Sequence, residues 1–450
     1  MGQLRIGAGS SYQRSAIKPA EELAKHGALD YLSFECLAER TIALAQLEKL
    51  EDPQKGYNPL LEERIRRVLP DCIENDITVV TNMGAVNPER AAERAVEVSR
   101  ELGLDEVTVA SVTGADVYDK FDRLEPTLLN GESIQQYEET AVSAQAYMGV
   151  EGIVEALEND ADVVITGRVS DVSLFLGPMV YEFGWSLDPL TDPDVVGQGI
   201  AAAHLVECSN NVTGGYFADP GYKEVEDLAG LGYPIIEVSE TGDVVITKLD
   251  SAGGIVTPQT CKEQLFYEVG DPAAYITPDA VADFSQITLT QDGTDRVRVE
   301  NATARSRTPT LKVNIGYDDG IVGEGQISYA GLGAYERAQL AGEAVRERIN
   351  DRDIVYDDLR VDYIGVNALH GAIGERQTKD PYEVRLRVAA KCHTQRDADR
   401  VTRLVENLYG SGAAGGGGAM RNTKRVIGIV STLLDREEVH ATVSYQEVSA

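Results

Sequence analysis

The sequence predicts an α/β protein of two domains, and three observations support this fold class. First, 450 residues are too many for one ordinary hydrophobic core. Second, short apolar segments rich in β-branched residues alternate with helical patterns over the first 170 residues or so, which indicates a mainly parallel sheet, either open and Rossmann-like or closed and barrel-like. Third, the pattern changes beyond about residue 299. We therefore expect an α/β domain at 1–308 and a smaller ferredoxin-like α+β domain at 309–450.

The expected strands of the first domain are short and are separated by helices, so right-handed crossovers should make them parallel. The strands are expected at 4–6, 31–34, 77–81, 107–112 and 163–166. The helices are expected at 20–26, 41–49, 59–68 and 88–102, with a long helical pattern over 133–157. Parallel strands present their carboxyl ends at one edge of the sheet, where α/β proteins bind their ligands.

Polar residues recur at these strand ends. They are Ser10, Glu35, Asn82, Asn87, Asp116, Arg168 and Asp171. Each of them alone is compatible with an ordinary loop position, such as a helix cap or a turn. Their recurrence at successive strand ends predicts one pocket that contains them.

A second group of polar residues follows a helix expected at 200–206. His204 and Glu207 lie three positions apart, which places them on one face of that helix. The pair is compatible with a general acid and base, with two metal ligands, or with an ordinary helical pair. No third ligand follows at a recognisable spacing, so we assign no metal site. Four further residues, Asn210, Asn211, Gly214 and Gly215, would supply amide groups and a close approach of the backbone.

A hairpin at 234–238 and 244–248 leads to a candidate anion site. Lys248 precedes the pair Gly253 and Gly254, and Thr257 is the expected N-cap of a helix over 259–269. Free backbone N–H groups at a helix start, together with a nearby cation, suit a carboxylate or a phosphate. The alternative is a simple helix start beside a surface lysine.

The C-terminal domain shows a different order of elements. Strands are expected at 325–330, 360–366, 383–390, 425–433 and 440–447, and helices at 334–349 and 397–409. This order is that of a ferredoxin-like fold with one added strand. The glycine-rich run at 410–418 is compatible with a flexible linker or with a backbone cradle or subunit contact.

Composition excludes several classes of partner. The net charge of −33 and the pI near 4.5 disfavour binding to nucleic acid or to an anionic membrane, and acidic residues dispersed along the chain are typical of adaptation to high salt. Five scattered cysteines without a C-x-x-C pair, and a start without a signal-like segment, predict a cytoplasmic protein. No apolar run is long enough for a membrane span. The first glycine turn lacks the third glycine of a dinucleotide site, so no cofactor is predicted. We expect a homo-oligomer.

Several motifs together resemble one known family. They include YLSFECLAE, TNMGAVNP, VITGRVSDVSLFLGP, HLVECSNNVTGGYFAD, TKLDSAGGIVTPQTCKEQLFYEV and LYGSGAAGGGG. In this order they are similar to the acyclic terpene utilisation protein A (AtuA) family. The resemblance implies a large N-terminal family domain and a smaller ferredoxin-like one. It also implies a role in the breakdown of acyclic terpenoids and branched acids through acyl-CoA intermediates, but no catalytic residues.

We therefore expect an enzyme that acts on a small carboxylate or an acyl-CoA in a lyase or hydro-lyase step. Proton transfer is assigned to Glu207 or Asp171 with help from His204, and Arg168, Lys248 and the glycine pair are expected to hold the anionic group. Two alternatives stay open: a non-catalytic subunit that binds an acyl-CoA or carboxylate in a multi-enzyme assembly, and a metal-dependent hydrolase. Cys36 and Cys208 are weaker candidates for a nucleophile.

Overall fold

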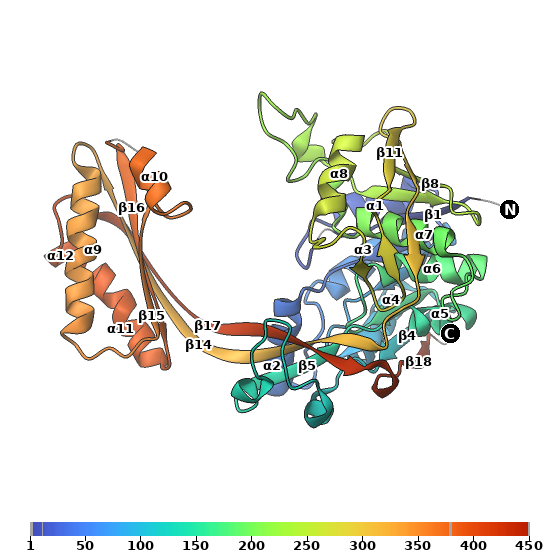
Figure 1. Ribbon diagram of the computed structural model, residues 1–450, viewed down its shortest axis with the longest axis horizontal. Coiled ribbons are helices and arrows are strands. Elements are labelled where there is room, and N and C mark those ends of the chain that lie inside the picture. Colours follow the sequence, from blue (N-terminus) through green and yellow to red (C-terminus); the bar gives the residue numbers. More distant parts are fainter. Residues whose placement is uncertain (1–2, 11, 378–379, 449–450) are drawn as a thin grey trace. The chain divides into compact units, whose positions relative to one another are not determined.

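The computed structural model describes residues 3–10, 12–377 and 380–448 (Figure 1). The chain divides into two compact units. Unit 1 comprises Met1–Gly316 and Ile429–Ala450, and unit 2 comprises Tyr317–Gly428. These bounds differ from the expected domains 1–308 and 309–450 mainly at the C-terminal end, where the last segment of the chain returns to unit 1.

Unit 1 contains most of the helices and strands. Its helices are α1 (Lys18–His26), α2 (Glu39–Glu51), α3 (Leu61–Glu74), α4 (Pro88–Leu102), α5 (Glu151–Glu158), α6 (Ser173–Phe183), α7 (Pro193–Glu207) and α8 (Pro258–Phe266), with short 3-10 helices η1 (Tyr118–Arg123), η2 (Ile134–Tyr137), η3 (Ser209–Asn211), η4 (Leu228–Gly230) and η5 (Arg436–Glu438). Its strands are β1 (Leu4–Ala8), β2 (Tyr31–Phe34), β3 (Thr78–Thr81), β4 (Thr108–Thr113), β5 (Ala141–Ala146), β6 (Val163–Thr166), β7 (Pro234–Val238), β8 (Val244–Lys248), β9 (Tyr275–Ile276), β10 (Val281–Asp283), β11 (Thr288–Gln291), β12 (Val297–Glu300), β13 (Thr303–Arg305) and β18 (Thr442–Glu447).

A ten-stranded sheet forms the centre of unit 1, in the order β11-β12-β8-β7-β1-β2-β3-β6-β4-β18. The strands from β1 to β4 in this order are parallel, and antiparallel strands extend the sheet on both sides. The sheet is therefore mixed, and among the described strands it is open, with β11 and β18 at its ends. One apolar core lies between the sheet and α5, α6 and α7, and a second between the sheet and α1, α3 and α4. The predicted α/β class is confirmed, whereas the expected predominance of parallel pairing is not.

Two segments differ from the expected elements. The helix expected over 133–157 is wrong: the segment forms η2, β5 and α5 instead. Gly149 lies between β5 and α5, where a Cβ atom built on the observed backbone would lie 2.3 Å from Oδ1 of Asp279, so this turn has no room for a side chain. The strand expected at 440–447 does form, as β18, but it pairs antiparallel with β4 of unit 1 and not with the C-terminal elements.

Unit 2 contains four neighbouring strands of a five-stranded sheet, whose fifth strand, β5, pairs with β14. Its elements are β14 (Thr310–Ala330), α9 (Ala334–Asn350), β15 (Asp358–Ile364), α10 (Ala372–Gln377), β16 (Glu383–Cys392), α11 (Gln395–Glu406), α12 (Leu408–Ser411) and β17 (Gly417–Asp435), of which β14 starts and β17 ends within the residues of unit 1. The strand order is β15-β16-β14-β17, and α9 and α11 pack on β16 over one apolar core. Within the glycine-rich run, the carbonyl groups of Ala414 and Gly418 accept hydrogen bonds from Arg337 and Arg385, so the run is tied to unit 2 at these points. No helix of the described chain is long and apolar enough to cross a membrane.

Candidate functional site

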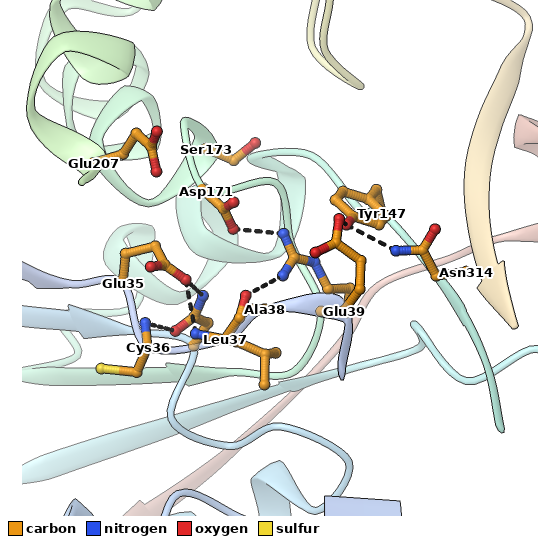
Figure 2. A network of polar contacts seen from close by, with 12 residues as sticks. Glu35, Cys36, Leu37, Ala38, Glu39, Tyr147, Asp171, Ser173, Glu207 and Asn314 are labelled. Carbon is orange, nitrogen blue, oxygen red and sulfur yellow. Dashed lines mark hydrogen bonds and ion pairs between the residues drawn. The ribbon is translucent and has the colours of Figure 1, made fainter. Parts of the chain in front are cut away.

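Charged and amide side chains from several elements of unit 1 meet at the carboxyl edge of the parallel strands. Glu35 follows β2, Asn82 follows β3, Arg168 and Asp171 follow β6, and Glu207 ends α7. Figure 2 shows the carboxyl groups of Glu35, Asp171 and Glu207 around the same space. Four of the residues expected at strand ends, Glu35, Asn82, Arg168 and Asp171, are therefore brought together, and Glu207 joins them from the end of α7.

Glu35 is held by the backbone of its own loop and by Asn82. Its Oε1 accepts hydrogen bonds from the Leu37 N–H at 2.7 Å and from Asn82 Nδ2 at 3.2 Å, while Asn82 Oδ1 accepts from the Cys36 N–H at 2.7 Å. The Ser10 hydroxyl donates to the Glu35 carbonyl. Burial, and after it the negative charge of Asp171, raises the pKa of Glu35 to about 8 against these hydrogen bonds. Glu35 is therefore largely protonated at neutral pH.

Arg168 forms the ion pair at the centre of the site. It is 1% exposed, donates to the Leu37 carbonyl and to Asp171 Oδ1, each at 2.5 Å, and its guanidinium lies 4.1 Å from the ring centre of Tyr147. Burial opposes its charge, but Asp171 and the other nearby acidic groups raise the pKa of Arg168 overall. The guanidinium is thus directed at protein groups, which leaves it little capacity to bind the carboxylate of a substrate directly.

Glu207 and Asp171 are two of the carboxyl groups that line a cavity at this edge. Burial, and then the charges of Asp171 and Glu35, raises the pKa of Glu207 well above its ordinary value. Cys208 Sγ donates to Glu207 Oε1 at 3.2 Å, and Gln264 Nε2 donates to the same oxygen at 3.4 Å. Burial also raises the pKa of Asp171, although Arg168 lowers it. Because Asp171 has the guanidinium beside it, Asp171 is the one of the pair that ionises more readily.

A cavity of about 180 Å³, called here the acidic cavity, opens over this pair. Its walls carry Glu39, Tyr147, Ser170, Asp171, Glu207, Glu268, Tyr275, Ile276, Thr277, Pro278, Thr308, Thr310, Leu311 and Lys312. Lys312 is the only basic residue among these described lining residues, and its Nζ lies 3.5 Å from Glu39. Glu39 also accepts a hydrogen bond from the Tyr147 hydroxyl at 2.6 Å. Burial opposes ionisation of Glu39, but the hydrogen bonds from Tyr147 and the backbone and the charges of Arg168 and Lys312 lower its pKa to about 2.

Of these lining residues, only Asp171 and Glu207 were expected from the sequence, and the missed residues include Tyr147, Glu268, Tyr275 and Lys312. Tyr147 lay within a segment expected to be helical, and Lys312 lay in the other expected domain. Asn314 is a further missed member, since its Nδ2 donates to the Tyr147 hydroxyl at 2.9 Å. Lys312 and Asn314 lie near the start of β14, whereas Tyr147 follows β5, Glu268 follows α8 and Tyr275 belongs to β9. The strands expected from the sequence include neither β5 nor β9, so the strand-end pattern did not indicate these residues.

Asn87, Asp116 and His204 were expected in the site but do not line the acidic cavity. Asn87 Nδ2 donates to the carbonyl groups of Pro53 and Lys55 and so fastens a loop. Asp116 is exposed and accepts from the Tyr118 N–H at 3.1 Å. His204 is buried, with Nε2 3.2 Å from the Leu265 carbonyl, and burial lowers its pKa to about 4. A neutral imidazole in this position is a packing group.

The expected anion site is occupied by internal contacts. Lys248 Nζ donates to the Leu249 and Ala252 carbonyl groups and pairs with Asp295 at 3.1 Å, and its side chain is 2% exposed. The N–H groups of Gly253 and Gly254 donate to the carbonyl groups of Gly230 and Glu226. Thr257 caps α8 as the sequence predicts, by accepting from the Thr260 N–H. These groups therefore hold loops together, and a ligand would have to displace their partners.

The remaining predicted residues surround the end of α7. Asn211 Nδ2 donates to Gln264 Oε1 at 2.9 Å, and the Gly215 N–H donates to the Asn210 carbonyl at 2.7 Å. Gly214 adopts a positive φ of 110°, which favours glycine. Asn210 lines a second cavity of about 600 Å³ near α1 and η4. In the part of the chain that the structure describes, no group of three or more His, Cys, Asp or Glu side chains is placed to hold a metal ion.

Comparison with known proteins identifies the family. The model of the family described as "Acyclic terpene utilisation family protein AtuA" matches residues 4–445. This match covers nearly the whole chain, so the chain belongs to the AtuA family, and the resemblance of its motifs is confirmed at the level of the family. No curated protein and no solved structure matches the chain.

Proposed function

We propose, with membership of the AtuA family as the premise, that this protein is an enzyme in the catabolism of acyclic terpenoids. Its substrate would be a small branched carboxylate or the corresponding acyl-CoA ester, and the reaction a lyase or hydro-lyase step. One observation carries the proposal: Asp171 and Glu207 line the same cavity, and their surroundings separate their tendencies to ionise. Such a pair is what acid-base catalysis requires.

In this proposal Asp171 is the base and Glu207 the acid. Ionised Asp171 takes the proton from the carbon next to the substrate carbonyl, and the electron pair of that C–H bond moves toward the carbonyl oxygen. The β-hydroxyl group then leaves with the proton of Glu207 as water, and a carbon–carbon double bond remains. Burial, and after it the charge of Asp171, keeps the pKa of Glu207 high, which favours its acid form.

The charge balance of the acidic cavity supports an anionic or thioester substrate. Asp171 is paired with Arg168 and Glu39 with Lys312, while Glu207 is held protonated by burial and by its acidic neighbours. At neutral pH the acidic cavity therefore carries fewer negative charges than it has carboxyl groups. Lys312, whose side chain is 41% exposed, is the group best placed to attract a carboxylate. A cavity of about 180 Å³ suits a small molecule or the reactive end of a longer one.

Further expectations belong to the same proposal. The strand order of unit 2, with β15 and β17 at the edges and β14 and β16 in the centre, supports a ferredoxin-like arrangement. The net charge of −33 supports adaptation to high salt. The proposal also includes that the protein self-associates and that it resides in the cytoplasm. Sedimentation in molar salt would test the oligomeric state.

The test of the reaction is exchange of the α-proton. The protein is incubated in D₂O and molar salt with short branched carboxylates and with their CoA esters, and deuterium uptake and loss of water are followed by NMR and mass spectrometry. We expect exchange and dehydration with one member of the panel. Asp171→Asn should abolish exchange, and Glu207→Gln should abolish loss of water, with the ligand still bound. Asp116→Asn, a change at an exposed site, is the matched control.

The outcomes separate the proposal from its main alternative. Binding of a carboxylate or CoA ester without exchange or loss of water would support a non-catalytic binding subunit. Activity that both carboxyl variants retain would contradict the roles given to Asp171 and Glu207.

A further inference from the structure

Tyr275 lines the acidic cavity and its hydroxyl has no partner in the described chain. The Tyr275 hydroxyl forms no hydrogen bond with a described residue. Its oxygen is nevertheless not one of the fully buried atoms without a partner. It therefore keeps accessible surface, and the acidic cavity is the opening that the side chain lines. By contrast, the hydroxyl of Tyr147 in the same cavity is fully engaged with Glu39 and Asn314.

The ring of Tyr275 is held firmly even though its hydroxyl is free. Its centre lies 4.8 Å from the ring of His204 and 5.3 Å from the ring of Phe284, and these two rings stack on each other at 5.9 Å. The backbone of Tyr275 belongs to β9, which pairs with β10. Aromatic contacts at such distances favour one orientation of the ring. His204 thus acts as part of a support for Tyr275, which accounts for a buried neutral histidine beside the site.

We infer that Tyr275 is a catalytic residue that donates a hydrogen bond to the oxygen on which negative charge develops when Asp171 removes a proton from the substrate. This inference rests on the proposed function. It also narrows the substrate to a compound with an acidic C–H group next to a carbonyl, carboxylate or thioester, since only then does charge develop on an oxygen. A fixed donor that is not spent on protein groups stabilises such a charge without reorganisation.

The local electrostatics agree with a donor that keeps its proton. Burial, and after it the charges of Glu207 and Asp171, raises the pKa of the Tyr275 hydroxyl well above its ordinary value. The proton therefore stays on Tyr275 while the electron pair of the broken C–H bond delocalises onto the substrate oxygen. Asp171 carries the abstracted proton away. No oxidant, reductant or further reactant is needed.

A binding experiment tests the inference without the need for turnover. The probe is 3-nitropropionate, a small carboxylate whose nitronate form carries negative charge on oxygen as an enolate does, and succinate is the matched probe without that property. Both are titrated calorimetrically into the full-length protein at pH 7 and pH 9. The wild type should bind 3-nitropropionate more tightly than succinate. Tyr275→Phe should lose about 10- to 100-fold of the affinity for 3-nitropropionate and little for succinate.

The matched control variant is Tyr118→Phe. Tyr118→Phe removes a hydroxyl outside the cavity that donates to the Ala141 carbonyl, and it should leave both affinities unchanged. Equal affinity of the wild type for the two probes, or an equal effect of Tyr275→Phe on both, would overturn the inference.

Turnover then separates this inference from the proposed function. With a substrate found by proton exchange, Tyr275→Phe should lower kcat by about 100- to 1,000-fold with little change in KM. Exchange that persists in Tyr275→Phe at the wild-type rate would refute the role of Tyr275 but not the proposed reaction. Conversely, tight binding of 3-nitropropionate that depends on Tyr275, in a protein without proton exchange, would refute only the reaction.

Discussion

Replacing Glu35 by glutamine should stabilise the protein in a way that depends on pH. The amide oxygen of glutamine can accept the two hydrogen bonds that Leu37 and Asn82 now donate to Glu35 Oε1. The change therefore preserves shape and packing and removes only the ability to ionise. Any pH dependence of the effect reports on the proton of Glu35.

The expected size follows from the raised pKa. Below about pH 4.5 the carboxyl group is protonated in both the folded and the unfolded protein, so Glu35→Gln should have little effect. Above this pH the unfolded chain loses the proton first, and the wild type loses stability as the pH rises through the folded pKa of about 8. A pKa of about 8 in place of 4.5 corresponds to at most about 5 kcal/mol at pH 9. Because Asp171 and Glu207 share the same surroundings, we expect Glu35→Gln to recover about 2 to 4 kcal/mol.

The assay is urea unfolding followed by the fluorescence of Trp185, which is the only tryptophan and lies in unit 1. Wild type and variant are compared at pH 5 to 9 in the same salt. Glu39→Gln is the control, since the pKa of Glu39 is about 2 and it stays ionised over this range. Its effect should be a modest, constant loss of stability, reduced by solvent screening because the Glu39 side chain is 43% exposed. A difference between Glu35→Gln and wild type that is flat over this range, or that shrinks as the pH rises, would refute the reasoning.

Three further predictions concern the contacts that shape unit 1. Lys248→Met should lower the free energy of unfolding by about 2 to 4 kcal/mol, because Asp295 and two carbonyl groups lose their partner. In calorimetry the variant should bind any carboxylate ligand with unchanged affinity. A selective loss of affinity would show that Lys248 anchors an anion after all. Gly149→Ala should cost about 1 to 3 kcal/mol in urea unfolding, because the new methyl group meets Asp279 at 2.3 Å, and an unchanged midpoint would contradict this steric argument. Deletion of 440–450 removes β18 from β4 and should destabilise unit 1 by about 2 to 4 kcal/mol, measured by Trp185 fluorescence; wild-type stability would show that the pairing with β4 contributes little.

The main features of the first sheet were predictable because they depend on local patterns. The strands after which Glu35, Asn82 and Arg168 lie are short apolar runs, and their parallel order follows from the helices between them. The antiparallel extensions of the sheet were not predictable in the same way. The place of β18 beside β4 depends on pairing across more than 300 residues of sequence, and no local pattern in the last strand specifies its partner.

The site could be predicted only in part, because the sequence does not show which groups surround each charged side chain in the fold. Sequence analysis places Arg168 and Lys248 near strand ends as cations, but it does not show which acceptors surround them. In the fold Arg168 is directed at Asp171 and the Leu37 carbonyl, and Lys248 at Asp295 and two carbonyl groups. The cation that remains exposed at the acidic cavity is Lys312. Lys312 also has a counter-charge, Glu39 at 3.5 Å, but its side chain is 41% exposed, whereas those of Arg168 and Lys248 are each 2% exposed, so exposure decides which of these cations a ligand can reach.

The buried carboxyl groups of the site can be judged by whether each has a counter-charge. An interior that gathers Glu35, Asp171 and Glu207 beside a single buried guanidinium loses stability whenever more than one of them ionises. Apolar side chains of similar size would avoid this loss, so packing alone does not account for the cluster. Lys248 and Asp295 show the contrasting case, in which a buried charge is matched by its partner and the ion pair fastens a loop. Carboxyl groups that share protons beside a cavity are the arrangement that proton transfer needs, and for this reason the cluster, and not the expected anion site, is where catalysis should be sought.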